Sequence, residues 1–477
     1  MKAVKLAGLE PANVFGYFEA LCRYPHGSGN EKAISDYIVS FAKEQGLRYI
    51  QDEKWNVIIF KDATAGYEDH APLILQAHLD MVCQTNEGSN IDMAVTPVDV
   101  THDGTYVYAK ETSLGADDCA GVALIMAVLA EKDIAHPPIE AVFTTYEEAG
   151  MHGAKAIDLS MLKGKRLWNI DTFNERIFTA GCAGSGRATL KLPLTFETRT
   201  VNRVRIVLEG LRGGHSGGMI KYNHANANIT MAKLLKQLPG VQIISMQGGM
   251  SGNAIPRSGR MDVAIAADAV EEAKKICAAF LEDLRTAGQE VDAQISLQAL
   301  GTDEAKVLSL EETARVLDFV LSLPNGLQTW DTRFEGLPRT SLNMGILEIS
   351  DHLEILFHLR SSVNEEKRAL MDGLKEAVTA AGGSYSETGV YSAWEYRDHS
   401  EFRDVLINVY KQTSDEPVRI LMIHAGLECG AFSEKIPGLD CVSNGPNASG
   451  AHTAKEKWEI AGVARYWEYM KKVLKAL

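Results

Sequence analysis

The chain has 477 residues, which is too many for one ordinary domain, so we expect two. Apolar residues make up 45% of the chain and charged residues 23%, a globular composition with ample material for a core. The formal net charge of −15 argues against a nucleic-acid-binding surface, which usually shows as clustered Lys and Arg.

The cysteines and the apolar runs bear on the compartment. Seven cysteines are scattered without a CxxC pair, so we expect reduced, mostly buried thiols in a cytoplasmic protein. Gly8, Glu10 and Pro11 interrupt the first apolar run, which argues against a secretory signal. The longest apolar stretch, 120–130, is far shorter than the roughly 20 residues that span a bilayer. We therefore predict a soluble protein without a membrane partner.

Strands and helices are predicted to alternate up to about residue 184. The predicted helices span 11–22, 31–45 and 120–132. The predicted strands span 56–60, 73–76, 139–145 and 166–170. This alternation favours an α/β sheet covered by helices, in which sites collect at the carboxyl ends of strands.

After residue 184 the pattern changes to one typical of an α+β unit with an antiparallel sheet. The predicted strands span 204–209, 241–246, 260–266, 293–300 and 353–359. The predicted helices span 225–237, 270–287, 310–321 and 365–381.

From about residue 391 an α/β pattern returns. Helices are predicted at 401–412 and 460–474, and strands at 418–422 and 439–443. If this segment completes the first domain, the middle region is an insertion that splits it. The predicted domains are then 1–184 with 391–477, and 185–390.

Five potential metal ligands arrive one at a time along the chain, mostly at the ends of apolar runs. They are His78, Asp117, Glu148, Asp171 and His452. Two imidazoles and three carboxylates match what two zinc-like ions with one bridging carboxylate require. Each motif is weak alone, and the joint pattern predicts metal-assisted hydrolysis.

Neighbouring residues support this interpretation. His78 and Asp80 share one side of a strand, so Asp80 is predicted to accept the second imidazole N–H and fix its tautomer. Of the adjacent Glu147 and Glu148, one can bind a metal while the other takes a proton from metal-bound water. Asp117 precedes a helix that it would suit as an N-cap, but its two oxygens also suit a bridge between cations.

These residues resemble the M20 metallopeptidase family, which includes glutamate carboxypeptidases, aminoacylases and cytosolic dipeptidases. The likeness covers essentially the whole chain. The motifs that carry it are Gln-Ala-His-Leu-Asp-Met-Val, Leu-Gly-Ala-Asp-Asp, Glu-Glu-Ala-Gly-Met-His-Gly, Leu-Arg-Gly-Gly-His-Ser-Gly-Gly and His-Ala-Gly-Leu-Glu-Cys-Gly.

The resemblance implies a catalytic α/β sandwich with a central mixed sheet, split by an inserted α+β domain that serves as lid and dimer interface in a homodimer. One zinc would be held by His78 and Asp171 and the other by Glu148 and His452, with Asp117 bridging. The resemblance also leaves manganese or cobalt open. Asp118 departs from the Asn that often follows the bridging aspartate in this family, which leaves the metal preference in doubt.

The resemblance further implies that Asp80 orients His78 and that Glu147 is the general base. Substrate-binding roles would fall to His215, which would steady the developing oxyanion, and to Asn253, Arg360 and Gly426. The planar fork of an arginine suits a substrate carboxylate.

The expected reaction is hydrolysis of dipeptides, of the Xaa-His type, by metal-bound hydroxide. The alternative within the family is an N-acyl amino acid deacylase, which would use the same metals. Gly214-His-Ser-Gly-Gly218 also fits the nucleophile-elbow pattern, which would make Ser216 a nucleophile. A non-catalytic binding module is the remaining alternative, although neither a ligand nor Glu147 is missing.

Overall fold

The computed structural model describes residues 5–286, 288 and 290–477, and it divides the chain into two compact units. Unit 1 comprises Met1–Cys182, Tyr396–Met422 and Leu427–Leu477, and unit 2 comprises Ala183–Glu395 and Ile423–Gly426. The borders differ from the predicted ones by a few residues, and the short stretch Ile423–Gly426 joins unit 2. That one unit is catalytic and the other a lid or dimer interface stays a prediction.

Unit 1 is built on a mixed sheet of eight strands in the order β1-β2-β6-β3-β7-β21-β8-β20. The strands are β1 (Arg48–Gln51), β2 (Val57–Lys61), β3 (Leu73–His78), β6 (Ile139–Thr144), β7 (Arg166–Phe173), β8 (Ile177–Cys182), β20 (Arg419–Ile423) and β21 (Asp440–Gly445). β3 runs parallel to β6 and β7, and β21 runs parallel to β7, whereas β1, β2 and β8 pair antiparallel with their neighbours. The predicted central mixed sheet is confirmed.

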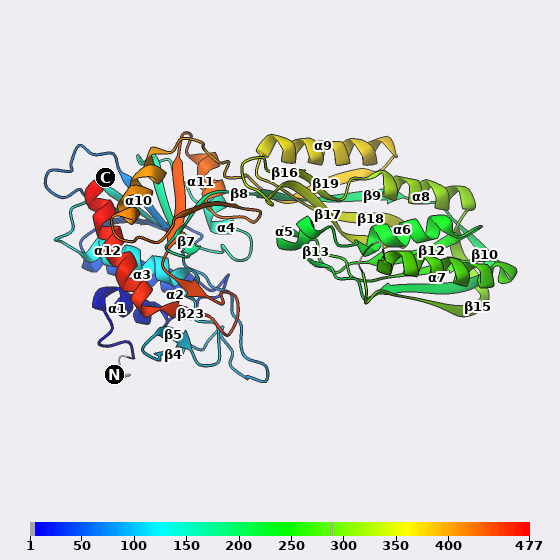
Figure 1. Cartoon of the computed structure of the whole chain (residues 1–477), viewed down its shortest axis with the longest axis horizontal. Coiled ribbons are helices and arrows are strands. Elements are labelled where there is room, and N and C mark those ends of the chain that lie inside the picture. The colour runs from blue at the N-terminus through cyan, green and yellow to red at the C-terminus, as the bar shows by residue number, and fades with distance from the viewer. Residues whose placement is uncertain (1–4, 287, 289) are drawn as a thin grey trace. The chain divides into compact units, whose positions relative to one another are not determined.

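Helices cover both faces of this sheet, which explains why the central strands β3 and β6 are buried along their whole length. The helices are α1 (Ala12–Leu21), α2 (Lys32–Glu44), α3 (Ala116–Ala130), α4 (His152–Ala156), α10 (Glu401–Lys411), α11 (Cys429–Lys435) and α12 (Ile460–Ala476). Leu73 and Leu75 of β3 join the main core with α1, α2, α3, α10 and α12, while the intervening Ile74 is buried on the other face. Figure 1 shows α1, α3 and α12, which all contribute residues to this core, close together.

A small second sheet in unit 1 joins the end of the chain to its first third. It contains β4 (Val100–His102), β5 (Tyr106–Ala109), β22 (Ala448–Ser449) and β23 (Lys457–Glu459). β23 pairs antiparallel with both β5 and β22. The loop between β22 and β23 is thereby fixed to the N-terminal part of the same unit.

Unit 2 is an α+β unit with an antiparallel sheet. Its strands are β9 (Gly184–Pro193), β10 (Phe196–Glu209), β12 (Gln242–Gly248), β14 (Gly259–Ala264), β15 (Gln294–Leu308), β16 (Gly326–Trp330), β17 (Pro338–Ile349), β18 (His352–Ser361) and β19 (Ser384–Tyr391). A short ribbon pairs β11 (Gly214–His215) with β13 (Ala254–Ile255). Alternate residues of β10, such as Val204 and Ile206, enter the core, as expected for a sheet with one covered face.

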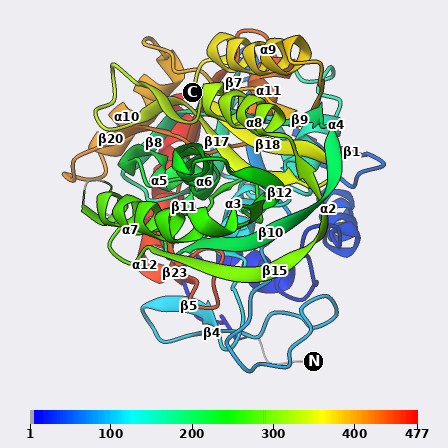
Figure 2. The same ribbon diagram turned by 90° about the vertical axis from the view of Figure 1, so that its right-hand side faces the viewer.

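The helices of unit 2 are α5 (Ser216–Met219), α6 (Ala227–Gln237), α7 (Val270–Thr286), α8 (Leu310–Ser322) and α9 (Asn364–Ala380), with short 3-10 turns at Ile220–Tyr222 and Ala267–Ala269. Figure 2 looks onto this unit and shows α6 and α8 against its strands. The predicted helix 270–287 ends at Thr286, and residue 287 lies outside the described residues. In the described part of the chain no helix has the length and apolarity needed to cross a membrane.

Candidate metal centre

The sheet of unit 1 brings three predicted metal ligands to one edge. β3, β6 and β7 are parallel neighbours, so their carboxyl ends lie together. His78 ends β3, and Glu148 lies in the turn after β6. Asp171 was predicted just after a strand, but β7 continues to Phe173 and contains it.

The other two ligands come from loops that pack on this edge. Asp117 lies at the start of α3, where the N-cap position is taken by Gly115. His452 lies in the loop between β22 and β23 and has a left-handed backbone with φ of 63°. The side chain of His452 is 51% exposed, whereas that of His78 is 1% exposed. The centre therefore has one deep and one open side.

Asp117 lies between the two imidazoles. Nε2 of His78 is 3.1 Å from Oδ1 of Asp117, and Nε2 of His452 is 3.1 Å from Oδ2 of the same carboxylate. Nε2 of His78 is also 3.8 Å from Oδ1 of Asp171, and Nε2 of His452 is 2.8 Å from Oε1 of Glu148. Each imidazole thus shares Asp117 and has a second carboxylate of its own.

This donor set fits a pair of divalent cations. Asp117, Glu148 and His452 offer ligand atoms that all lie within 4.8 Å of one another, as do His78, Asp118 and Asp171. Oε1 of Glu148 is buried and has no hydrogen-bond partner among the described residues, although Nε2 of His452 is close by. Lone pairs that meet without hydrogen-bond geometry are expected where a cation belongs between them.

The charges at the site lead to the same conclusion. Burial lowers the pKa of His78, but the carboxylates of Asp117 and Asp171 outweigh it and raise that pKa well above its ordinary value. The neighbouring carboxylates of Asp117 and Glu148 raise the pKa of His452 to about 10. Burial raises the pKa of Asp171 to about 6. A cation would replace the imidazole protons as the partner of these crowded carboxylates.

Asp80 approaches the His78 imidazole more closely with its main-chain carbonyl than with the carboxylate that was predicted to accept the imidazole N–H. Nδ1 of His78 lies 3.0 Å from the main-chain carbonyl oxygen of Asp80 and 3.6 Å from its carboxylate. The carboxylate instead accepts hydrogen bonds from the N–H groups of Glu147 at 2.8 Å and Glu148 at 3.1 Å, and from the hydroxyl of Ser28 at 2.7 Å. Asp80 therefore holds the two-glutamate turn as well as the imidazole.

Glu147 lies beside the ligands. Its carboxylate can reach within 4.8 Å of ligand atoms of His78 and Glu148. Burial raises the pKa of Glu147 well above its ordinary value, and the nearby charges of Asp171 and Glu428 raise it further. A carboxylate with a raised pKa next to a metal site is suited to accept and return a proton.

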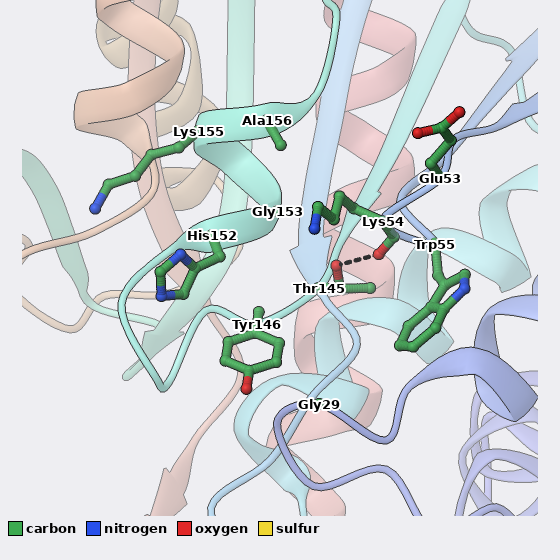
Figure 3. A pocket seen from close by; sticks show the side chains of 10 residues that line it. All are labelled: Gly29, Glu53, Lys54, Trp55, Thr145, Tyr146, His152, Gly153, Lys155 and Ala156. Atoms are coloured by element: carbon green, nitrogen blue, oxygen red, sulfur yellow. Dashed lines mark hydrogen bonds between the residues drawn. The ribbon is translucent and has the colours of Figure 1, made fainter. Parts of the chain in front are cut away.

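The turn that carries the glutamates is supported from behind by aromatic contacts. Tyr146 has a left-handed backbone with φ of 59°, and its ring packs against Gly29, where a Cβ would lie 3.0 Å from the ring. His152 meets the Tyr146 ring edge-on at 5.2 Å between centroids. Figure 3 shows these side chains around a cavity of about 650 Å³, with Trp55 on its opposite side.

Two buried glutamates contribute to the site and escaped prediction. Glu456 accepts hydrogen bonds from the N–H groups of Leu114, Gly115 and Asp117 at 2.8 to 3.0 Å. Glu428 accepts from the hydroxyl of Thr144 at 2.6 Å, and burial raises its pKa to about 7. Neither follows an apolar strand, so the pattern that marked the ligands could not mark them.

The predicted substrate-binding residues all belong to unit 2. His215 and Asn253 lie at the paired ribbon strands β11 and β13, which brings them next to each other. Arg360 lies on β18, and Gly426 ends the stretch Ile423–Gly426. Burial lowers the pKa of His215, and the charge of Arg360 lowers it further, so these two side chains share one region of the unit.

Arg360 is buried between neutral imidazoles. It is 7% exposed and interacts with Tyr391, but no carboxylate pairs with it among the residues that the structure describes. Nε2 of His358 lies 2.6 Å from Oγ of Ser185, and Nε2 of His424 lies 2.8 Å from Oγ of Ser341. Burial, reinforced by the Arg360 charge, lowers the pKa of each of these two histidines to about 3. The guanidinium is thus a buried charge that an anionic ligand would neutralise.

The nucleophile-elbow alternative finds no support in the geometry. Ser216 is 3% exposed, and its hydroxyl has no hydrogen-bond partner among the described residues. Nδ1 of the neighbouring His215 accepts the N–H of Gly217 at 3.2 Å. A nucleophilic serine needs an exposed hydroxyl bonded to a base, and this one has neither.

Comparison with known proteins agrees with the geometry. The model of Peptidase family M20/M25/M40 matches residues 74–476. The cytosol non-specific dipeptidase of Escherichia coli is 34% identical over 99% of each chain. The crystal structure of aminoacylhistidine dipeptidase from Vibrio alginolyticus superposes with a TM-score of 0.89 at 33% identity, covering 99% of this chain and 98% of that one. An aminopeptidase from Bacillus cereus, 16% identical with a TM-score of 0.56 over 98% of both chains, shares the fold.

Proposed function

Because this chain belongs to peptidase family M20/M25/M40, we propose that it is a two-metal dipeptidase that cleaves Xaa-His dipeptides. The observation that carries the proposal is the placement of Asp117 between His78 and His452, 3.1 Å from each. The similarity to an aminoacylhistidine dipeptidase supports the choice of substrate, since it extends over nearly the full length of both chains.

The proposed division of labour follows the two halves of the donor set. His78 and Asp171 would hold one ion, Glu148 and His452 would hold the other, and Asp117 would bridge them. Two such ions supply Lewis-acid chemistry, lowering the pKa of a water and polarising the peptide carbonyl. Zinc is the proposed metal, because imidazole and carboxylate ligands suit it, although manganese and cobalt share these ligands.

Glu147 carries the proton in this mechanism. It takes a proton from the attacking water and returns it to the leaving amine, so the peptide is cleaved into two free amino acids. Asp80 positions Glu147 through its hydrogen bond to the Glu147 N–H group. The position of Glu147, whose carboxylate lies within 4.8 Å of ligand atoms of His78 and Glu148, supports this role.

Unit 2 supplies the proposed recognition of the substrate. Arg360 binds the C-terminal carboxylate, His215 and Asn253 act on the reacting carbonyl oxygen and its surroundings, and the backbone at Gly426 seats the peptide. Arg360 is buried without a carboxylate partner among the described residues, which supports a substrate carboxylate as its ligand. We further propose a cytoplasmic homodimer in which unit 2 is the lid and carries the dimer interface.

A substrate panel tests the proposed function against the deacylase alternative. The purified zinc-loaded protein should hydrolyse Gly-His and Leu-His, and cleave N-acetyl-histidine at least about a hundredfold more slowly in kcat/KM. The measurement is release of free histidine by chromatography. Faster cleavage of the N-acetyl amino acid than of both dipeptides would replace the dipeptidase with a deacylase.

A further inference from the structure

A second cavity of unit 1, which we call the Cys83 cavity, opens beside the candidate metal centre. Its volume is about 600 Å³. Glu148, a proposed metal ligand, is part of its wall, and so is Ser28, whose hydroxyl donates to Asp80. The remaining lining residues are Gly27, Asn30, Met81, Val82, Cys83, Gln84, Thr85, Ile91, Asp92, Met93 and Ala94.

Backbone hydrogen bonds fix the walls of this cavity. The N–H of Met81 donates to the carbonyl oxygen of His26 at 3.1 Å, and the N–H of Ser113 donates to that of Gln84 at 2.8 Å. The side-chain amide of Asn30 donates to the carbonyl oxygen of Ala94 at 2.9 Å, which connects two lining segments that are far apart in the sequence. The cavity is therefore preformed, as most small-molecule sites are.

The walls combine apolar side chains with polar ones, namely Ser28, Asn30, Gln84 and Thr85, and with two acidic ones. Of the apolar lining residues, Met81 and Met93 are buried, and Val82 and Ile91 are partly exposed. Methionine side chains are flexible and adapt to apolar groups of different shape. Asp92 and Glu148 carry the only charges among the lining residues, and both are negative.

This charge pattern decides which end of a dipeptide the cavity would take. Because Glu148 would be paired with a metal ion, Asp92 is the one free charge among the lining residues, and it would repel a carboxylate and attract an α-ammonium group. An apolar side chain would gain by burial against the methionines. The cavity thus suits the amino-terminal residue and disfavours the carboxyl-terminal one.

We propose that the Cys83 cavity receives the side chain of the amino-terminal residue of the dipeptide and sets the preference for that residue. This inference rests on the proposed dipeptidase function and adds the specificity-determining wall to it. Medium and large apolar side chains fill the cavity, and acidic ones are rejected. Met81, Met93 and Cys83 define the space available beyond the metal centre.

Cys83 makes the proposal testable without redesigning the site. It is an exposed free cysteine, while the other six cysteines are buried. Its Sγ lies against Gly27 in the wall, where a Cβ on residue 27 would be only 2.7 Å away. A benzyl methanethiosulfonate reagent attaches a benzylthio group to this thiol, with release of methanesulfinate, and dithiothreitol removes it. Bulk can therefore be placed in the cavity and taken out again.

The experiment measures kcat/KM for Gly-His, Leu-His and Phe-His before labelling, after labelling and after dithiothreitol. Labelling should lower the values for Leu-His and Phe-His at least about tenfold and that for Gly-His less than about threefold. Dithiothreitol should restore all three. The control is the Cys83→Ser protein, in which the ratios of kcat/KM among the three dipeptides should be the same before and after treatment with the reagent. A Cys83→Trp variant adds similar bulk permanently and should show the same loss for Leu-His and Phe-His.

Two results would overturn the inference. An equal loss for all three substrates would mean that the bulk blocks the metal centre or the shared histidine end. Unchanged kcat/KM values for Leu-His and Phe-His, in the Cys83→Trp variant and also in the protein whose adduct is verified by mass, would mean that the cavity is not used. Failure of the proposed function would look different, because the untreated protein would then cleave none of the three dipeptides.

Discussion

At the scale of single residues, the candidate centre depends on side chains that neighbouring residues hold in position. Asp117 can serve two cations because each of its oxygens faces a different imidazole. Residue types and order along the sequence were enough to predict that these side chains come together, since each of them is a typical metal-binding side chain. The contact of Asp80 was only partly predictable, because alternation along a strand gives its side but not that the turn of Glu147 and Glu148 would come within hydrogen-bond reach.

Two buried histidines of unit 2 predict a pH dependence of stability. The pKa of His358 and of His424 is lowered to about 3 by burial, whereas an unfolded chain titrates near the ordinary value of about 6.5. Between these values the unfolded state binds more protons than the folded state. Stability is therefore fully present above about pH 6.5 and is lost as the pH falls toward 3.

Replacing His358 with Asn should flatten this dependence. Each histidine contributes a slope of about 1.4 kcal/mol per pH unit within the window, so the variant should lose about that much of the slope between pH 5 and 6. The measurement is the free energy of unfolding of unit 2 from urea denaturation at several pH values. His399→Asn, at an exposed position, is the control. An unchanged slope in His358→Asn would contradict the assignment of a neutral buried imidazole.

At the scale of elements, the start of α3 is fixed by a residue from the far end of the chain. The carboxylate of Glu456 accepts hydrogen bonds from three backbone N–H groups of the segment that carries Asp117. A carboxylate is suited to this task because both of its oxygens accept hydrogen bonds. The sequence alone offered no signal for this contact, since Glu456 lies in a charged stretch that resembles an ordinary solvated loop.

The Glu456→Gln variant should weaken metal binding through the position of Asp117. Its amide nitrogen cannot accept a hydrogen bond, so we expect a loss of about 1–3 kcal/mol in the free energy of unfolding and of about tenfold to a hundredfold in metal affinity. Chelator competition measures the affinity. Glu468→Gln, on the exposed side of α12, changes the charge equally and should leave the affinity unchanged. Native affinity in Glu456→Gln would show that Asp117 is positioned without it.

The elements that escaped prediction have physical reasons. β9 begins with Gly184, where a Cβ would lie 2.4 Å from the main-chain nitrogen of Ala393, so close packing of two backbones requires glycine at a position where strands usually avoid it. β17 contains Thr340, Ser341 and Asn343, which are buried through side-chain hydrogen bonds. The first half of β17 therefore lacks the apolar alternation that marked β10.

At the scale of the whole molecule, the sequence predicted the class of fold and the return of the chain to its first unit. The prediction came from the α/β pattern on both sides of an α+β segment and from a fifth ligand, His452, near the end. The structure places this residue 3.1 Å from Asp117. What the sequence could not supply was the small sheet of β5, β22 and β23 that holds the His452 loop, because its strands are only two to four residues long.

The proposed activity depends most on two cations held by His78, Asp117, Glu148, Asp171 and His452, with Glu147 close by and unbound. Anomalous diffraction from metal-loaded crystals of the Glu147→Gln variant tests this most directly. We predict two peaks that share Asp117, one next to His78 and Asp171 and the other next to Glu148 and His452, in a protein without measurable turnover. Loss of either peak would make Glu147 a ligand, and the absence of both from native crystals of fully active protein would contradict the metal centre itself.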